Sequence, residues 1–240
     1  MSHLTGGERS QYVQTMFTRI ARRYDLMNRV MTAGQDVRWR REVIRRAALP
    51  KGGRLLDLGA GTGDLAREAL RQCAGCQPIA ADFTLEMMLI GRRRLQNSPE
   101  EARKLAWSAA DATRLPFPRA SFEAVVSGFL LRNVNDLPGS LAEQYRVLRP
   151  GGRIVCLDTS PPPSGPLNPF IRFHLHTIIP TLGRVITGQA EAYRYLPDST
   201  EAFLEPEQLA AQLIEAGFQE VGYQRRMFGT ISIHWGTKPG

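Results

Sequence analysis

Short apolar runs alternate with longer stretches of helical periodicity from about residue 52 onward. Five runs predict strands: RLLDLG, PIAAD, LAWSAAD, FEAVVSGF and RIVCLDTS. Helical patterns lie at residues 62–71, 85–95 and 137–148, and a turn at Pro150-Gly151-Gly152 is expected to precede the fifth strand. Strands that alternate with helices predict an α/β fold with a parallel sheet and helices on both faces.

The end of the chain follows a different pattern. A helix is predicted from Pro206 to Ala216, closed by Gly217, and the strands FQEVGYQRRM and TISIHWGTK follow with no helix between them. Two strands joined by a short turn must be antiparallel. A parallel sheet that ends in an antiparallel hairpin differs from the usual dinucleotide-binding fold.

The length of the chain predicts a single domain, because 240 residues can bury a substantial core. Within it we distinguish an N-terminal helical segment at 1–50, a core at 51–160, an insertion at 161–200, and a last helix with its hairpin at 201–240. Neither a membrane span nor a secretory signal is visible. A cytoplasmic location is therefore expected.

The three cysteines are too few for a disulfide framework and suit a reducing compartment. Cys73 and Cys76 form a C-x-x-C, but no second pair of cysteines or histidines lies nearby to complete a zinc site. We expect an unpaired loop pair and no metal.

Positive charge is concentrated near the N-terminus. The net charge is +8, and nine arginines stand between Arg19 and Arg46, interleaved with apolar residues. This pattern predicts basic amphipathic helices. Such helices either rest on an anionic membrane surface or pack on the core with a solvated arginine face, and the sequence leaves both open.

The glycine-rich bend DLGAGTGD lies between the first strand and its helix. Gly59, Gly61 and Gly63 give G-x-G-x-G, and Asp64 occupies the place of the third glycine of a dinucleotide fingerprint. A carboxylate there would repel a pyrophosphate, and no lysine follows to make a P-loop. Asp57 adds a second negative charge. Two carboxylates around this loop fit a ligand with a cationic end and no phosphate, so we predict that it binds S-adenosylmethionine.

Two more acids follow the next two strands. Asp82 lies 19 residues after Gly63, where a carboxylate accepts both ribose hydroxyls. Asp111 ends the third strand, where with the adjacent Ala112 backbone it is expected to bind the adenine amino edge. Acids at the carboxyl ends of consecutive parallel strands share one crevice, which strengthens the prediction.

The segment after the fourth strand, SGFLLRNVND, concerns the methyl acceptor. The Asn/Asp-Pro-Pro-aromatic motif common in enzymes that methylate amino groups is absent, so no nucleic-acid partner is expected. Arg132 and Asn133 stand where the methyl should emerge. A fixed cation beside an amide is suited to stabilise an oxygen anion, as carbon methylation of a phenol demands.

Blocks along nearly the whole chain resemble one enzyme family. They are YDLMNRVMTAGQDVRWR, DLGAGTGD, GFLLRNVND, YRVLRPGGR, YRYLPDS and GTISIHWGTKP, and they resemble the ubiquinone/menaquinone biosynthesis C-methyltransferases (UbiE/MenG family). The resemblance implies a Rossmann-like class I methyltransferase, with a seven-stranded, mostly parallel sheet of order 3-2-1-4-5-7-6 and strand 7 antiparallel. It also implies methylation of a polyprenylated demethylquinol.

The resemblance assigns donor contacts to Thr62, Asp82, Asp111 and Ala112, and we place Gly128, at the end of the fourth strand, with them. The family usually has glycine at the place of Leu130 and glutamate at the place of Asp158. We expect both departures to affect the acceptor more than the donor.

Carbon methylation requires the reduced ring, because a quinone is electrophilic whereas a quinol can attack a methyl sulfonium. Arg132 is expected to be the electrostatic partner of the ring oxygen, since guanidinium stays protonated, and Asn133 to orient it. The proton acceptor is left open among Asp158, Tyr193, Tyr195, His174 and His176. We expect Tyr24, His174 and Tyr193 to contact the acceptor, and the reaction requires no metal.

The stretch PLNPFIRFHLHTIIPTLGRVITG, at 166–188, is apolar but interrupted by prolines and glycines. It either flanks a prenyl tail or fills a core, and we favour the tail. With the basic N-terminal segment it predicts an enzyme that docks transiently on the inner face of a membrane.

Three alternatives stay open. The chain could methylate another lipid or small aromatic molecule, it could methylate RNA, or it could bind S-adenosylmethionine as a non-catalytic scaffold of a quinone-synthesis complex. Within the first hypothesis we favour demethylmenaquinol over the ubiquinone precursor. The sequence leaves tail length and oligomeric state open.

Overall fold

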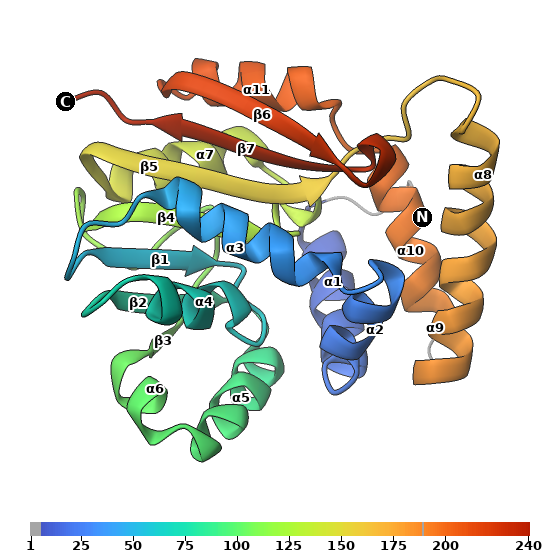
Figure 1. The fold of residues 1–240 in the computed structure, drawn as a ribbon, viewed down its shortest axis with the longest axis horizontal. Helices are drawn as coiled ribbons and strands as arrows, with labels where there is room; N and C mark the ends of the chain where they lie inside the picture. Colours follow the sequence, from blue (N-terminus) through green and yellow to red (C-terminus); the bar gives the residue numbers. More distant parts are fainter. Residues whose placement is uncertain (1–5, 189) are drawn as a thin grey trace.

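The computed structural model describes residues 6–188 and 190–240. Its centre is a seven-stranded sheet of order β3-β2-β1-β4-β5-β7-β6 (Figure 1). The strands are β1 (Arg54–Leu58), β2 (Gln77–Asp82), β3 (Ala106–Ala109), β4 (Phe122–Gly128), β5 (Leu148–Thr159), β6 (Gln219–Arg226) and β7 (Ile231–Thr237). Strands β1 to β5 pair in parallel, and β7 is antiparallel to both β5 and β6. The predicted strand order and antiparallel last strand are confirmed.

Helices cover both faces of the sheet. The helices of the core are α3 (Gln35–Ala47), α4 (Asp64–Gln72), α5 (Leu85–Arg94), α6 (Pro99–Lys104), α7 (Leu137–Val147) and α11 (Pro206–Glu215). In β1, Leu56 and Leu58 pack in the cluster that includes α7 and α11, whereas Leu55 packs in the one that includes α3 and α4. Because both faces are buried, the central strands are continuous apolar runs.

The other helices gather beyond the carboxyl ends of the parallel strands, at the right of Figure 1. They are α1 (Gly6–Ile20), α2 (Tyr24–Met31), α8 (Asn168–Phe173), α9 (Ile179–Thr187) and α10 (Ala190–Glu201). A π turn over His174–Ile178 joins α8 to α9, so the prolines and glycines of the insertion leave α8 continuous with α9. The N–H of Ile179 donates to the His174 carbonyl, and Pro180, which has no N–H, follows.

The turn expected at Pro150-Gly151-Gly152 lies inside β5 instead. The strand begins at Leu148 and resumes regular pairing with β4 at Arg153, so the residues between form an irregularity in the pairing. Gly151 has φ +76°, and its N–H donates to the Lys238 carbonyl at 2.9 Å. The turn prediction was wrong because glycine at positive φ serves a bulge as readily as a turn.

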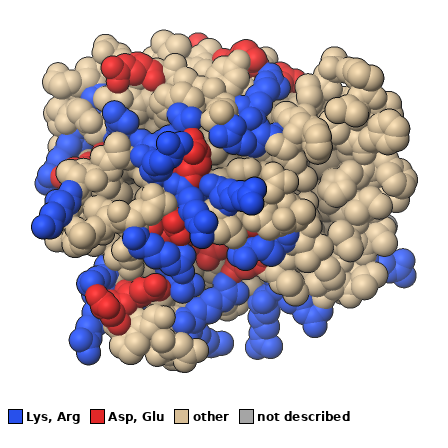
Figure 2. All heavy atoms as spheres, viewed as in Figure 1, with Lys and Arg blue, Asp and Glu red and all other residues tan. Residues whose placement is uncertain are grey.

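The N-terminal arginines are largely paired within the fold. The ion pairs are Arg29–Asp36, Arg40–Asp36, Arg41–Glu68, Arg45–Glu42 and Arg46–Glu42. Arg46 also stacks on the Trp235 ring, 3.7 Å from its centroid. Figure 2 shows basic and acidic side chains interspersed in this view. Five of the nine arginines thus have a carboxylate partner within the fold, and contact of this segment with a membrane stays a prediction.

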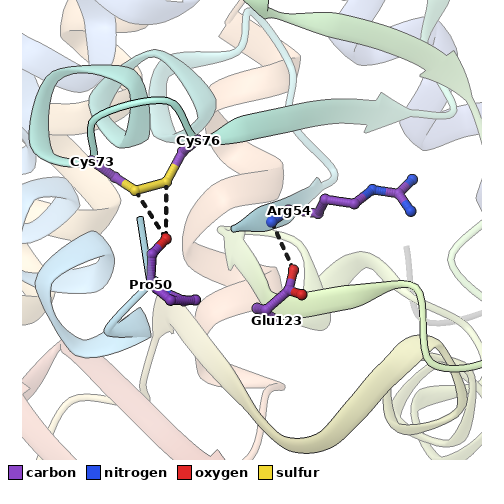
Figure 3. Close-up of a disulfide and its surroundings, with 5 residues drawn as sticks. All are labelled: Pro50, Arg54, Cys73, Cys76 and Glu123. Atoms are coloured by element: carbon purple, nitrogen blue, oxygen red, sulfur yellow. Dashed lines mark hydrogen bonds between the residues drawn. A yellow bond between two sulfur atoms is a disulfide. The ribbon is translucent and has the colours of Figure 1, made fainter. Parts of the chain in front are cut away.

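Cys73 and Cys76 form a disulfide, so the expectation of an unpaired loop pair was wrong. The end of α4 brings their Cα atoms to 5.6 Å, within the range that a disulfide spans. Both sulfur atoms lie near the Pro50 carbonyl oxygen, and the Arg54 N–H donates to the Glu123 carboxylate at 2.7 Å (Figure 3). Since β2 begins directly after Cys76, the bond lies at the amino end of that strand.

Candidate active site

Two adjoining pockets lie at the carboxyl ends of the parallel strands. The polar pocket, of about 300 Å³, is lined by the loops after β1, β2, β3 and β4 together with α1 and α2. The apolar pocket, of about 350 Å³, is lined by α1, α2, α8, α10 and the turn between β6 and β7, among other segments. Four residues line both pockets: Phe17, Tyr24, Phe129 and Asn133. A molecule held in one pocket therefore adjoins a molecule held in the other.

The glycine loop of the polar pocket requires its glycines. Gly59, Gly61 and Gly63 have φ of +66°, +58° and +82°, a region that other residues rarely adopt. A Cβ at Gly59 would lie 2.7 Å from a Leu130 methyl carbon, and one at Gly63 would lie 2.8 Å from the Trp107 ring. The loop is thus shaped both by its backbone conformation and by side chains pressed against it.

Leu130 lines the polar pocket and is not among the residues that line the apolar pocket. It belongs to the turn after β4, which directs its side chain onto Gly59. The side chain thus stands on the side of the glycine loop, and the expectation that it affects the acceptor more than the donor stays a prediction.

Asp57 lies at the end of β1 and is buried, with 1% of its surface exposed. Its Oδ2 accepts the Ala66 N–H at 2.9 Å, which ties the strand to the first turn of α4. Burial raises the pKa of Asp57 to about 7, the Ala66 N–H opposes that rise, and nearby Asp64 and Asp82 add to it. A cation bound in this pocket would favour the ionised form of Asp57.

Asp82 ends β2 and supports the glycine loop directly. Its Oδ2 accepts the Gly61 N–H and its Oδ1 accepts the Thr84 N–H, both at 2.7 Å. Burial raises the pKa of Asp82, and these N–H donors lower it. Asp82 therefore ties the glycine loop to the loop after β2.

Asp111 and Ala112 line the polar pocket beyond β3, and Gly128 lines it at the end of β4. The third strand ends at Ala109, two residues earlier than predicted, and Asp111 instead begins a turn. Its Oδ1 accepts the N–H and the hydroxyl of Thr113, each at 2.8 Å. Eight of the nine predicted donor residues line this pocket: Asp57, Gly59, Gly61, Thr62, Asp82, Asp111, Ala112 and Gly128. Gly63 is not among its lining residues and stands at the N-cap of α4.

The sequence analysis did not identify Asp25 as an acid of this pocket. Asp25, on α2, accepts the Thr62 hydroxyl at 3.0 Å and pairs with Arg94 of α5. It lies in the block YDLMN, so the resemblance contained it, but no local pattern linked that block to the glycine loop. Thr62 is thus already engaged by a side chain of the N-terminal segment.

Helix α1 lies across the polar pocket and is tied to both of its sides. The Gln14 side chain donates to the Phe83 carbonyl at 3.2 Å, and Thr18 donates to Glu86 at 3.1 Å. On the other side, Arg9 donates to the Arg132 carbonyl at 3.0 Å. The N-terminal segment is therefore part of the site.

Arg132 and Asp158 form a buried ion pair behind the apolar pocket. The Arg132 guanidinium lies 2.5 Å from Asp158 Oδ1, and the two side chains are 5% and 1% exposed. Asp158 also accepts the Arg132 N–H at 3.3 Å and the Thr159 N–H at 2.8 Å. Arg132 lines the apolar pocket, whereas Asp158 is not among the lining residues of either pocket. Asp158 therefore positions the guanidinium.

Asn133 and Tyr195 are brought together at the wall between the pockets. The Tyr195 hydroxyl donates to Asn133 Oδ1 at 3.1 Å, and Asn133 Nδ2 donates to the Phe129 carbonyl at 3.0 Å. Both ends of the amide are thus held, which fixes its orientation.

The structure separates the two histidines of the insertion. His174 lines the apolar pocket, and its buried Nε2 has no hydrogen-bond partner among the residues that the structure describes. His176 points elsewhere, with its Nε2 2.9 Å from Glu201 Oε1. Tyr193 is buried in the same pocket, and burial raises the pKa of its hydroxyl. Tyr24 lines both pockets.

The apolar pocket holds further buried polar atoms without a partner in the described ranges. They are Arg132 Nε, Asn28 Nδ2, Thr159 Oγ1, Thr200 Oγ1 and the hydroxyl oxygen of Tyr193. An unpaired buried polar group costs about 1–3 kcal/mol, so such atoms are normally met by a ligand or by water. Sequence reasoning missed Asn28, Thr159 and Thr200, although the first stands in YDLMN and the last follows YRYLPDS.

Carboxylates that surround a glycine loop without a phosphate-binding helix end, on a sheet of this order, define a class I S-adenosylmethionine-dependent methyltransferase. More narrowly, the chain belongs to the ubiE/COQ5 methyltransferase family, whose model matches residues 6–238. Among the described residues, no cluster of three His, Cys, Asp or Glu side chains could hold a metal ion, and no helix is long and apolar enough to cross a membrane.

Curated relatives agree with this assignment, and a solved structure shows the same fold. A Desulfotalea psychrophila protein named ubiquinone/menaquinone biosynthesis C-methyltransferase UbiE is 47% identical, over 94% of this chain and 90% of its own. A demethylmenaquinone methyltransferase of Thermus thermophilus is 44% identical, over 93% of this chain and 100% of its own. Among solved structures, the [4+2]-cyclase SpnF shares the fold at TM-score 0.71 and 18% identity, covering 96% of both chains.

Proposed function

We propose that this chain transfers a methyl group from S-adenosylmethionine to a ring carbon of a reduced polyprenyl quinol, with demethylmenaquinol as the favoured acceptor. The observation that carries the proposal is the pair of pockets: a polar one suited to a cationic nucleotide and an apolar one suited to a lipid quinol, with Asn133 and Tyr24 in their common wall. The names of the relatives support the same acceptor class.

The polar pocket would hold the methyl donor, which supplies an electrophilic methyl on sulfur. The glycine loop allows close backbone approach, and Asp57 provides negative charge for the cationic end. Asp82 would receive the ribose hydroxyls, and Asp111 with the Ala112 backbone the adenine edge. Thr62 and Gly128 complete the lining.

The apolar pocket would hold the quinol ring with its oxygens toward the unpaired polar atoms. Arg132 offers its buried Nε–H to a developing oxygen anion, while Asp158 holds the guanidinium in place. Asn133, locked by Tyr195, orients the ring against the common wall. In this arrangement the ring carbon can be aligned with the methyl, which accounts for much of the rate.

Among the candidate proton acceptors, His174 is the one that the geometry favours. Asp158 is committed to Arg132, His176 pairs with Glu201, and Tyr195 donates to Asn133. Tyr193 keeps its proton because burial raises its pKa. Of this set, His174 is the imidazole whose buried Nε2 lies in the pocket without a partner in the described ranges.

In the proposed reaction, His174 Nε2 takes the hydroxyl proton of the quinol. The ring carbon then bonds to the methyl as the S–CH3 bond breaks, and that electron pair stays on sulfur. The carbon loses its own C–H proton, which restores the aromatic ring, while the oxygen regains a proton from His174. One proton in total leaves to solvent, which balances the conversion of a sulfonium into a thioether.

The proposal also places the chain in the cell. A polyprenyl tail keeps the acceptor in a bilayer, so we place the protein in the cytoplasm with transient contact at the inner face of the membrane. Polyprenyl quinol, rather than nucleic acid, is its expected partner.

The test is methyl transfer from labelled S-adenosylmethionine to short-tailed demethylmenaquinone, with and without dithionite. Label on the ring carbon only under reduction would support both the acceptor and the quinol mechanism. No label, although the donor binds, would overturn the menaquinone assignment; transfer to a demethoxyquinol instead would assign the ubiquinone precursor.

The non-catalytic alternative has its own test. An Arg132→Ala variant that binds the donor normally should lose quinone methylation in cells. Unchanged quinone methylation would indicate a scaffold.

A further inference from the structure

Three side chains that line the apolar pocket are also strongly exposed to solvent. They are Leu167 at 54%, Phe170 at 74% and Phe228 at 74%. Phe173, one turn after Phe170 on α8, is 59% exposed. We call these four residues the rim. Because most of them both line the pocket and face water, the rim marks the opening through which an apolar ligand enters.

The rim is formed by two segments that are distant in the sequence. Leu167, Phe170 and Phe173 come from the start of the insertion, whereas Phe228 comes from the turn between β6 and β7. Phe228 has φ +55°, and Met227 before it has φ +45°. A phenylalanine held outward in so uncommon a backbone conformation indicates a role in water-facing contact rather than in packing.

The charge around the rim is unlike that of the N-terminal helices. In Figure 2 the surface over α8, at the upper right, is nearly free of Lys, Arg, Asp and Glu atoms. Arg172, on the same helix, lies 3.0 Å from Glu201. The arginines of α2 and α3 are mostly engaged with carboxylates, as described above. An apolar contact surface thus stands at the pocket mouth, while the basic surface stands elsewhere.

We propose that the rim inserts into the interfacial layer of a phospholipid bilayer and that the tail of the bound acceptor passes directly from the apolar pocket into the lipid between α8 and the β6–β7 turn. This rests on the proposed function, because only an acceptor with an apolar tail needs such a passage. Aromatic side chains are favoured at this depth of a bilayer. The rim also explains how the insertion leads the tail into lipid, although no helix in the described ranges is long and apolar enough to cross a membrane.

The first experiment measures flotation of the full chain with vesicles of neutral phosphatidylcholine. Wild type should bind, and a Phe170→Ser/Phe228→Ser variant should bind more weakly by at least about tenfold for each aromatic side chain removed from lipid contact. Ile214→Ser is the matched control, since Ile214 is 60% exposed on α11 and lines neither pocket. Its binding should equal that of wild type.

Equal vesicle binding by wild type and the double variant would overturn the proposal. So would binding that appears only with anionic phosphatidylglycerol, persists in the double variant and disappears at high salt, because that result would assign the contact to the arginines. Circular dichroism and thermal unfolding of each variant show that the fold is retained.

Activity separates this proposal from the function on which it rests. The double variant should lose more activity on a long-tailed acceptor embedded in vesicles than on a short-tailed acceptor in solution. Equal losses on both would contradict the rim as the membrane contact. If wild type methylates neither acceptor, the proposed function fails, whereas the vesicle-binding result still reports on the rim.

Discussion

The two pockets are built in opposite ways. The polar pocket is made chiefly by backbone turns and carboxylates that follow β1, β2 and β3, so a short piece of sequence after each strand contributes one part of it. The apolar pocket is made by side chains from α1, α2, α8, α10 and the turn before β7, which are far apart in the chain. A polar site on a parallel sheet is thus fixed by local sequence, whereas the apolar site beside it depends on how helices pack.

The largest expected effect comes from removing one partner of the buried Arg132–Asp158 pair. Arg132→Met should lower the free energy of unfolding by about 3–5 kcal/mol, because Asp158 is left as an unpaired buried charge. Adding Asp158→Asn should recover part of this stability without restoring methyl transfer. Urea unfolding and donor titration measure both, and donor affinity should change little. Equal stability of the single and double variants would contradict the pairing.

The second prediction concerns the histidine of the apolar pocket. His174→Gln should lower kcat by about 100-fold or more, as loss of a general base does, with donor affinity unchanged. Steady-state kinetics with a short-tailed acceptor measure kcat, and calorimetric titration measures donor affinity.

The matched control is His176→Gln on the same helical segment, which should retain wild-type kcat. If both histidine variants behave alike, His174 is not the base. Partial rescue of His174→Gln by added imidazole would support it further.

The third prediction perturbs only the polar pocket. Gly59→Ala should weaken donor binding, because alanine at φ +66° costs about 1–2 kcal/mol and its Cβ meets Leu130. Leu130→Gly in the same chain relieves the contact but not the backbone cost, so affinity should return in part. Calorimetric titration with S-adenosylhomocysteine measures the series. Full recovery would show that only the contact matters.

The fourth prediction uses the raised pKa of Asp57, about 7. Below that pH the free protein holds a proton there, and a cationic ligand favours its release, so donor binding should release about one proton at pH 6 and almost none at pH 8. Titration calorimetry in buffers of different ionisation enthalpy measures it. Asp57→Asn should abolish the release, whereas Asp111→Asn, at an exposed carboxylate, should keep it.

The raised pKa of Asp57 also determines how the free energy of unfolding changes with pH. Its folded pKa lies above the ordinary value of 3.8, so the folded state binds more protons between those two values. Without ligand, the contribution of Asp57 to the free energy of unfolding therefore falls as pH rises from about 4 to about 7 and is constant above. Wild type should lose more stability than Asp57→Asn over that range.

The smallest effect on methyl transfer is expected at the disulfide, which lies at the amino end of β2. The Cys73→Ser/Cys76→Ser variant lacks the disulfide. Because that disulfide closes a loop of only a few residues, its loss should lower the free energy of unfolding by at most about 2 kcal/mol. Both pockets should keep their affinities and kcat should not change. A loss of activity at unchanged stability would show that the two ends of the sheet are coupled.

The sequence predicted much of the fold because alternating apolar runs and helical patterns depend on local burial. Gly151 shows the limit of that approach, since a glycine in a bulge and a glycine in a turn look alike until the neighbouring strand is known. Cys73 and Cys76 show another, because a C-x-x-C spacing allows a disulfide, an unpaired pair or half of a metal site, and the sequence does not distinguish them.

The residues of the candidate site differ in the same way, since some could be predicted from local sequence and others depend on packing. The candidate donor residues could be predicted because they stand at or just after the ends of strands, but Asp25 and Asn28 could not, since only the packing of α2 against the glycine loop and the insertion gives them their positions. His174 and His176 both lie in the π turn that begins at His174. No residue pattern in the insertion predicts that turn, so the sequence does not tell which histidine faces the pocket.

The two pockets have different exposed borders: Phe83 and Asp111 border the polar one, and the rim borders the apolar one. In the proposed reaction, separate openings would let spent donor exchange for fresh donor while the acceptor stays in the apolar pocket. An enzyme that works in this way would load its two substrates in either order. It would stay on one membrane and methylate many quinols before dissociating, with each new donor molecule entering from the water.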